Sequence, residues 1–387
     1  MMCRSVGLLL VALGWAGCGC RGFSVPASLS MTESSSAQGG AVPLISVAGG
    51  SGRVGRLAVK RVLEMYPEAR VRAVVRDAAR AKDVLSEELT SQRLEVVKAD
   101  LSTAAGITAA VKDCSAMVWC ATSFSDASAH SFRKSWAQRS PPVQRIFNLA
   151  AFLFNPDNCL EAKAVPAAAA ALAANGAPPY RLQAPTPAPV PEQPPKKGGT
   201  RPSLGAKGGS KGGAGGGDGE GVLPRFVLLS SAAVTRPAWS AAEKEEFKAA
   251  AQIPIVKLNP FKILDLKRKG EEALRRTAVP YTIVRPCGLN DKQAPGRLIV
   301  SAGDVAAGRI CRADVAEGLA ACLSEPLATA KTFEMFALPG LSKAPVGPPI
   351  GSLPTDAQLS SPDALQAVRR GAYGLLSQLR PVQNFDV

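Results

Sequence analysis

The sequence predicts an α/β fold in which helices cover both faces of a doubly wound parallel sheet. Short β-branched runs alternate with amphipathic stretches of helix length, and this alternation is typical of parallel βαβ units. A glycine-rich segment at residues 49–55 directly follows the first of these runs and opens the first helix. Together these two observations predict a sheet domain that begins near residue 41.

The first half of the domain, residues 41–161, alternates regularly. Hydrophobic periodicity predicts strands at residues 44–48, 71–75, 94–98 and 116–120, with helices between them at residues 54–65, 78–89 and 105–112. A further helix is expected at residues 143–154.

The middle of the chain, residues 162–221, breaks this periodicity. It runs through an alanine tract, a proline-rich segment and a glycine- and lysine-rich segment. Such a composition buries too little apolar surface to offset the entropy of ordering, so we predict a disordered insertion within one domain. Its lysines could contact RNA or anionic lipid, but no aromatic residues are interleaved for base stacking. A solvated linker is favoured, and nucleic acid is not the expected partner.

The alternation resumes after the insertion, in residues 222–338. Strands are predicted at residues 225–230, 281–285, 298–301 and 332–337, and helices at residues 241–251, 260–276 and 313–323. The resumption indicates one Rossmann-like domain that the insertion splits. A C-terminal tail, residues 339–387, is rich in Pro and Gly and contains one expected helix at residues 363–379.

Residues 1–40 have the features of a targeting leader. Arg4 precedes an apolar run at residues 6–16 that is too short to span a bilayer and resembles a secretory h-region. Phe23 and a Ser- and Ala-rich stretch follow, as in the bipartite leaders of plastid proteins in algae with red-type secondary plastids. This resemblance predicts the plastid, with a plain secretory leader as the alternative. We expect no transmembrane helix in the mature chain.

The composition excludes several kinds of chemistry. The only histidine of the 387 residues is His130, so a zinc site of His and Cys or a Ser-His-Asp hydrolase would have to be built around it. The nine cysteines contain no C-x-x-C pair, and most of those in the body of the chain have apolar neighbours typical of core residues. No metal site is expected. The net charge of +15 favours anionic partners.

The glycine-rich segment is the main candidate binding site. Glycines allow a tight turn and a close approach to a pyrophosphate, and the helix that follows offers N–H groups and a favourable dipole. The alternative is a turn that needs glycine only for packing the helix on the strand. The predicted phosphate loop consists of Gly49, Gly50, Ser51, Gly52, Arg53, Val54 and Gly55.

The end of the second strand favours NADP(H) over NAD(H). An NAD-binding fold would place an acid there for the ribose hydroxyls, whereas this sequence has Arg76 followed by Asp77. A cation suits a 2′-phosphate, and Arg53 could make a second contact to it. Arg76 could instead be an ordinary solvated residue, and the neighbouring Asp77 weakens the argument.

Several segments resemble the atypical, NmrA-like NAD(P)-binding branch of the short-chain dehydrogenases/reductases, and most closely its plastid members. The matching segments are VAGGSGRVG (47–55), VRAVVRD (71–77), VVKADL (96–101), FVLLSSAAVTRP (226–237), LKRKGEEALRRTAVPYTIVRPCGL (266–289) and GRICRADVAEGLAACL (308–323). The resemblance implies that Asp100 and Leu101 flank the adenine and that Ala121 and Thr122 line the cofactor. It places Pro286 near the nicotinamide, although a structural turn is an equal alternative.

The resemblance also implies a catalytic pair, with one departure. Ser231 falls on the serine position of the family, and Lys267 on the lysine of its Tyr-x-x-x-Lys motif, so the tyrosine position falls on Ile263. Isoleucine cannot exchange a proton with the substrate. From position alone, Ser231 lies past a parallel strand, where ligands bind, or is a turn or cap serine. Lys267 holds a nicotinamide ribose or is one of several solvated lysines.

Two functions therefore remain open. The first is an NADP(H)-dependent oxidoreductase of the plastid that acts on an unknown carbonyl or enone. The second is a non-catalytic nucleotide-binding protein, with a photosynthetic protein partner or a role in plastid gene expression or redox sensing. RNA binding through the basic insertion is a third, weaker reading.

Overall fold

A computed structural model describes residues 42–123, 159–177, 180–182, 221–259 and 262–379. The predicted leader, His130, the helix expected at residues 143–154 and the lysine-rich part of the insertion lie outside the described residues. The described residues belong to one compact unit.

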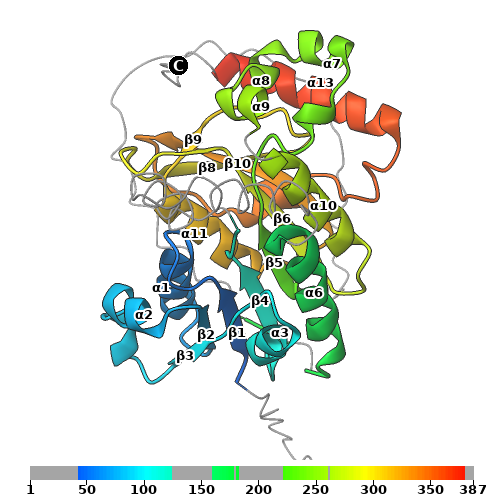
Figure 1. Cartoon of the computed structure of the whole chain (residues 1–387). Coiled ribbons are helices and arrows are strands. Elements are labelled where there is room, and N and C mark those ends of the chain that lie inside the picture. The colour runs from blue at the N-terminus through cyan, green and yellow to red at the C-terminus, as the bar shows by residue number, and fades with distance from the viewer. Residues whose placement is uncertain (1–41, 124–158, 178–179, 183–220, 260–261, 380–387) are drawn as a thin grey trace, which may run out of the picture. The chain divides into compact units, whose positions relative to one another are not determined.

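An eight-stranded sheet forms the centre of this unit (Figure 1). Its strand order is β3-β2-β1-β4-β5-β6-β10-β8, and every pairing is parallel except that of β8 with β10. The order reverses between β1 and β4, which is the doubly wound arrangement that the sequence predicted. In chain order the strands are β1 (Leu44–Ala48), β2 (Arg70–Val75), β3 (Leu94–Lys98), β4 (Ala116–Trp119), β5 (Phe226–Leu229), β6 (Tyr281–Pro286), β8 (Gly296–Ser301) and β10 (Lys331–Pro339).

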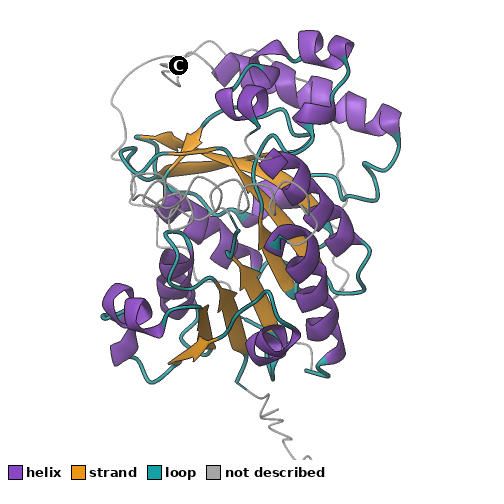
Figure 2. Cartoon of the chain, viewed as in Figure 1, coloured by secondary structure: helices purple, strands orange, loops and turns teal. Residues whose placement is uncertain are grey.

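Helices cover both faces of the sheet (Figure 2). One face packs against α1 (Gly55–Met65), α2 (Ala78–Val84) and α11 (Arg312–Cys322), whose apolar residues share one core cluster with the sheet. The other face packs against α3 (Ala104–Val111), α6 (Val165–Ala174) and α10 (Ile263–Arg275) in a second cluster. The two cores account for the continuous burial of the central strands.

The prediction that residues 162–221 form a disordered insertion is wrong for its first part, which contains helix α6 (Val165–Ala174). A π-helical turn (Leu160–Ala164) leads into α6, and Ala168, Ala169 and Leu172 are fully buried against the sheet. Alanine has the highest helix propensity, and its small side chain permits close packing between α3 and α10. Residues 183–220 lie outside the part of the chain that the structure describes.

Other predicted helices differ at their ends. The helix predicted at residues 78–89 ends at Val84, and a 3₁₀ turn (Glu88–Thr90) follows. The one predicted at residues 241–251 divides into α7 (Ala241–Glu246) and α8 (Lys248–Ala251). Helix α10 starts only at Ile263, after the short α9 (Pro254–Leu258), because the backbone at Asn259 and Lys262 is left-handed.

The tail contains the predicted helix as α13 (Pro362–Leu379) and an unpredicted short helix, α12 (Gly347–Gly351). Helix α13 packs on α7 and α8 (Figure 1). Phe247 makes T-shaped, edge-to-face contacts with Trp239 and Tyr373, and Arg369 pairs with Glu243. The remaining short elements are β7 (Gly288–Leu289), β9 (Arg309–Ile310) and 3₁₀ turns at Arg236–Ala238 and Pro326–Ala328. None of the helices in the described ranges is long and apolar enough to cross a membrane.

Candidate functional site

The glycine-rich loop has a backbone that only glycine permits. Gly49 has a φ of 77°, and a Cβ there would lie 2.9 Å from the Ala121 backbone. A Cβ on Gly55 would lie 2.1 Å from the carbonyl oxygen of Gly49. The amides of Gly49 and Gly50 both donate to the carbonyl of Val74, which ties the loop to β2. The loop is therefore a fixed cradle next to the end of β4.

Helix α1 begins at this loop without a side-chain cap. Val54 stands at the N-cap position and accepts no hydrogen bond through its side chain. The helix start lies at the carboxyl end of β1, where the strand order reverses, and a crevice at that point is the usual ligand site of a doubly wound sheet. The glycine cradle and the uncapped helix dipole fit a pyrophosphate.

Arg76 and Asp100 are neighbours at the ends of β2 and β3. Arg76 is exposed directly after β2, whereas Asp77 caps α2 by accepting hydrogen bonds from the amides of Ala79 and Arg80. Hydrogen bonds from Ser102 and the nearby charge of Arg76 hold the pKa of Asp100 below its ordinary value. Asp77 thus caps its own helix, and Arg76 is an exposed cation at this corner.

Two predicted residues have structural contacts that the sequence did not show. Leu101, expected beside the adenine, is buried and packs in the core with Ile107 and Trp119. Arg53 extends from the loop to Asp291, with 2.8 Å between the guanidinium and the carboxylate. Arg312, at the start of α11, pairs with the same carboxylate oxygen.

A small hollow, open to solvent, adjoins the glycine loop at the ends of β4 and β5. Ala121 and Lys267, both predicted site residues, contribute to its wall, and Thr122 donates a hydrogen bond of 2.6 Å to Glu161, which also lines it. Glu161 was not predicted as a site residue, because it falls just before the alanine tract. The hollow is lined by Trp119, Ala121, Glu161, Val165, Leu228, Leu229, Ser230, Lys267 and Gly270.

Ser231 lies two residues after the end of β5, and its hydroxyl donates to the carbonyl of Ala232 at 3.0 Å. Pro286, at the end of the adjacent β6, accepts a hydrogen bond from the Ala232 amide, so the two strand ends are joined beside Ser231. The neighbouring residue in the chain, Ser230, lines the hollow.

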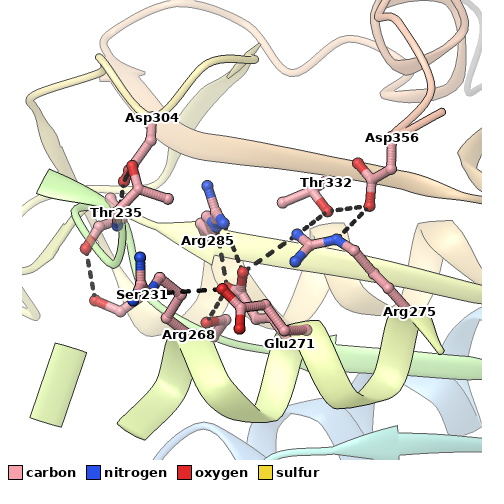
Figure 3. Close-up of polar contacts among 12 residues, drawn as sticks. Ser231, Thr235, Arg268, Glu271, Arg275, Arg285, Asp304, Thr332 and Asp356 are labelled. Carbon is pink, nitrogen blue, oxygen red and sulfur yellow. Dashed lines mark hydrogen bonds and ion pairs between the residues drawn. The ribbon is translucent and has the colours of Figure 1, made fainter. Parts of the chain in front are cut away.

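A buried ion pair supports these strand ends (Figure 3). Burial alone would raise the pKa of Glu271, but two hydrogen bonds from Arg285 hold it below its ordinary value. The hydroxyl of Ser230 also donates to Glu271. Arg275 extends from Glu271 to Asp356, which links α10 to the tail. The pair fixes β5, β6 and α10 relative to one another.

The expected catalytic tyrosine has no replacement by another tyrosine of the chain. Ile263 stands at its position and packs against a small apolar cluster. All four tyrosines lie in described residues, and each hydroxyl is hydrogen-bonded elsewhere in the fold. Tyr66 donates to Ala320, Tyr180 to Pro224 and Tyr281 to Asp356, and the Tyr373 hydroxyl accepts the amide of Ala249.

Sequence comparison agrees with this geometry. The sequence model of the NAD(P)H-binding family matches residues 49–170 and 220–326, more than half of the chain. The chain belongs to the NAD(P)H-binding family. The match confirms the nucleotide-binding assignment that the glycine motif predicted, and it brackets the residues that form the cradle and the hollow. A search of the curated proteins found no match.

Solved structures with a similar fold come from several bacteria. A Bacillus halodurans protein assigned as an NAD-dependent epimerase/dehydratase has 16% identity and a TM-score of 0.47, covering 80% of this chain and 100% of its own. The anaerobilin reductase ChuY of Escherichia coli O157:H7 has 16% identity and a TM-score of 0.44, with coverages of 78% and 100%. A Veillonella parvula short-chain dehydrogenase/reductase solved with NADP has 12% identity and a TM-score of 0.43, with coverages of 76% and 94%.

Proposed function

We propose that this member of the NAD(P)H-binding family is an NADP(H)-dependent oxidoreductase that acts on a carbonyl or enone substrate. The observation that carries the proposal is the hollow beside the glycine cradle. Lys267 and Ser230 line it at the carboxyl ends of the central strands, which is where the reacting end of a dinucleotide lies in such sheets.

Different residues of this chain bind different parts of the nucleotide and the substrate. The cradle and the start of α1 hold the pyrophosphate, and Arg76 pairs with a 2′-phosphate. Lys267 donates hydrogen bonds to the nicotinamide ribose, and the Ser231 hydroxyl turns from the Ala232 carbonyl to a substrate oxygen. The bound nucleotide supplies the hydride. Since no tyrosine lies at the site, water or another group supplies the proton.

The preference for NADP(H) rests on the corner formed by Arg76 and Asp100. Asp77 is bonded to the first turn of α2 and so is not positioned as the acid that an NAD-binding fold presents to the ribose. The exposed guanidinium of Arg76 suits a phosphate dianion better than a ribose hydroxyl.

The absence of the tyrosine favours a second candidate function. With Ile263 at that position, the chain could bind a nucleotide without turning over a substrate, as an assembly, gene-expression or redox-sensing factor for the photosynthetic apparatus. The leader, which resembles those of secondary plastids, supports a plastid location for either function. A fluorescent fusion of the full chain tests this: plastid fluorescence is expected, and a secreted fusion contradicts it.

The experiment that separates the two functions is a comparison of NADPH binding with NADPH oxidation. An oxidoreductase binds NADPH and oxidises it with quinones or enones. Lys267→Met then lowers both the affinity for NADPH and the rate of its oxidation. Lys269→Met, an exposed lysine on the same helix, is the matched control and leaves both unchanged. Binding without oxidation across the substrate panel supports the non-catalytic function.

A further inference from the structure

The buried carboxylate of Glu161, which lines the hollow with Lys267, has one oxygen without a hydrogen-bond partner among the described residues. Glu161 is only 4% exposed, and its Oε1 accepts hydrogen bonds from the Thr122 hydroxyl and, at 3.1 Å, from the Ser123 amide. Its Oε2 is buried and has no partner among the residues that the structure describes. Buried polar atoms are nearly always hydrogen-bonded, so an oxygen left over at the wall of an open hollow indicates a ligand.

The fold holds Glu161 close to Lys267. A Cβ on Gly270 would lie 2.2 Å from the Glu161 carbonyl oxygen, so only a glycine at this position lets α10 come so near the π-helical turn. Lys267 lies three residues earlier on α10, on the same side of the helix as Gly270. Both Glu161 and Lys267 line the hollow.

The hollow continues the path of a bound dinucleotide. Its wall includes Ala121, which contacts the glycine cradle at Gly49. A nucleotide with its pyrophosphate at the start of α1 therefore passes Ala121 before it reaches the hollow. The part that arrives there is the second ribose and its base, and each ribose hydroxyl both donates and accepts a hydrogen bond.

We propose that Glu161 and Lys267 together bind the hydroxyls of the nicotinamide ribose, with Glu161 Oε2 as the acceptor and Lys267 Nζ as the donor. A lysine ammonium has donors only, so a ribose diol bound by Lys267 alone keeps its own hydrogens unpaired. The carboxylate oxygen without a partner satisfies them. This assignment rests on the proposed nucleotide-binding function and adds to it a residue outside the family motifs named above.

The test compares two ligands by calorimetric titration of the full chain. NADPH contains the nicotinamide ribose, whereas adenosine 2′,5′-bisphosphate contains only the adenosine half with its 2′-phosphate. For Glu161→Gln we expect about tenfold weaker NADPH binding, the effect of one hydrogen bond to a charged group, and unchanged binding of the bisphosphate. Glu334→Gln is the matched control, because Glu334 is also a buried glutamate with one unpartnered oxygen but lies outside the hollow.

Each other outcome has a distinct meaning. Unchanged NADPH binding by Glu161→Gln, or an equal loss for both ligands, overturns the assignment but leaves nucleotide binding intact. A wild-type chain that binds neither ligand overturns the proposed function itself. If Glu161→Gln does not fold, Glu161→Asp makes the same test, because it keeps the negative charge but withdraws the carboxylate from the hollow. A loss confined to NADPH supports the assignment, and unchanged NADPH affinity contradicts it.

Discussion

Arg53, in the glycine-rich loop, forms an ion pair with Asp291, which lies 238 residues later in the chain. Asp291 belongs to the segment after β7, and the same carboxylate oxygen pairs with Arg312 at the start of α11. These two arginines hold the pKa of Asp291 below its ordinary value. The carboxylate thus offsets positive charge at the edge of the cradle.

Asp291→Asn therefore strengthens NADPH binding. Without the carboxylate, Arg53 and Arg312 face the nucleotide phosphates with their full charge, and we expect about threefold tighter binding because the pair is exposed and partly screened. The gain shrinks at high salt. Calorimetric titration at low and high salt measures it, with Asp363→Asn on the exposed start of α13 as the control for net charge. Weaker binding by Asp291→Asn contradicts this role.

Arg76→Ala separates the two nucleotides. Loss of the guanidinium removes the proposed charge-assisted contact to the 2′-phosphate, so we expect NADPH binding to weaken about tenfold and NADH binding to stay the same. Arg276→Ala, an exposed arginine at the end of α10, removes the same charge and changes neither affinity. Equal losses for NADPH and NADH would show that Arg76 does not recognise the 2′-phosphate.

A matched pair of glycine substitutions tests the packing that places Glu161. Gly270→Ala drives a methyl group into the Glu161 carbonyl and destabilises the fold by about 1–3 kcal/mol. Gly371→Ala, in the exposed middle of α13, meets nothing within 4 Å and stabilises it by about 0.5–1 kcal/mol through helix propensity. Urea unfolding of both variants measures the difference. Similar stabilities would mean that α10 is not held this closely.

Glu334 makes stability depend on pH. Burial and the nearby Asp304 raise the pKa of this carboxyl to about 7, from an ordinary value of 4.5. An acid whose pKa is raised on folding stabilises the fold while it is protonated. This stability is lost as pH rises from about 4.5 to 7.

Glu334→Gln removes that dependence. Between pH 5 and pH 8 the wild type loses on the order of 2 kcal/mol of unfolding free energy that Glu334→Gln keeps, so the variant becomes more stable relative to the wild type by that amount. Urea unfolding of both proteins at the two pH values measures the difference. A relative stability that is independent of pH would mean that Glu334 titrates normally.

The regular part of the fold follows directly from local patterns in the sequence. The strands at residues 44–48 and 94–98 have the predicted bounds, because β-branched runs bounded by polar turns are strong local signals. The glycine cradle was also predictable. Its glycine spacing indicates nucleotide binding only between a strand and a helix, and the sequence predicted a strand before it and a helix after it. Asp77 as the cap of α2 is a contact of the same local kind.

The parts that the sequence did not predict depend on distant contacts. Helix α6 was assigned to the insertion because an alanine tract has no amphipathic period, yet alanines pack well where two helices approach closely. Glu161 becomes a candidate site residue only because the fold places it in the same hollow as Lys267, which lies more than a hundred residues later in the chain. The pairing of Arg53 with Asp291 likewise joins segments that no local pattern relates.

The most direct test of the central claim is calorimetric titration of the full chain with NADPH and NADH, together with Gly52→Asp. A side chain on Gly52 begins 3.0 Å from the Gly49 carbonyl and adds a negative charge to the cradle, whereas Gly371→Asp makes the same change on the exposed face of α13. We expect saturable NADPH binding that is tighter than NADH binding, is lost in Gly52→Asp and persists in Gly371→Asp. A wild-type chain that binds neither nucleotide would contradict it.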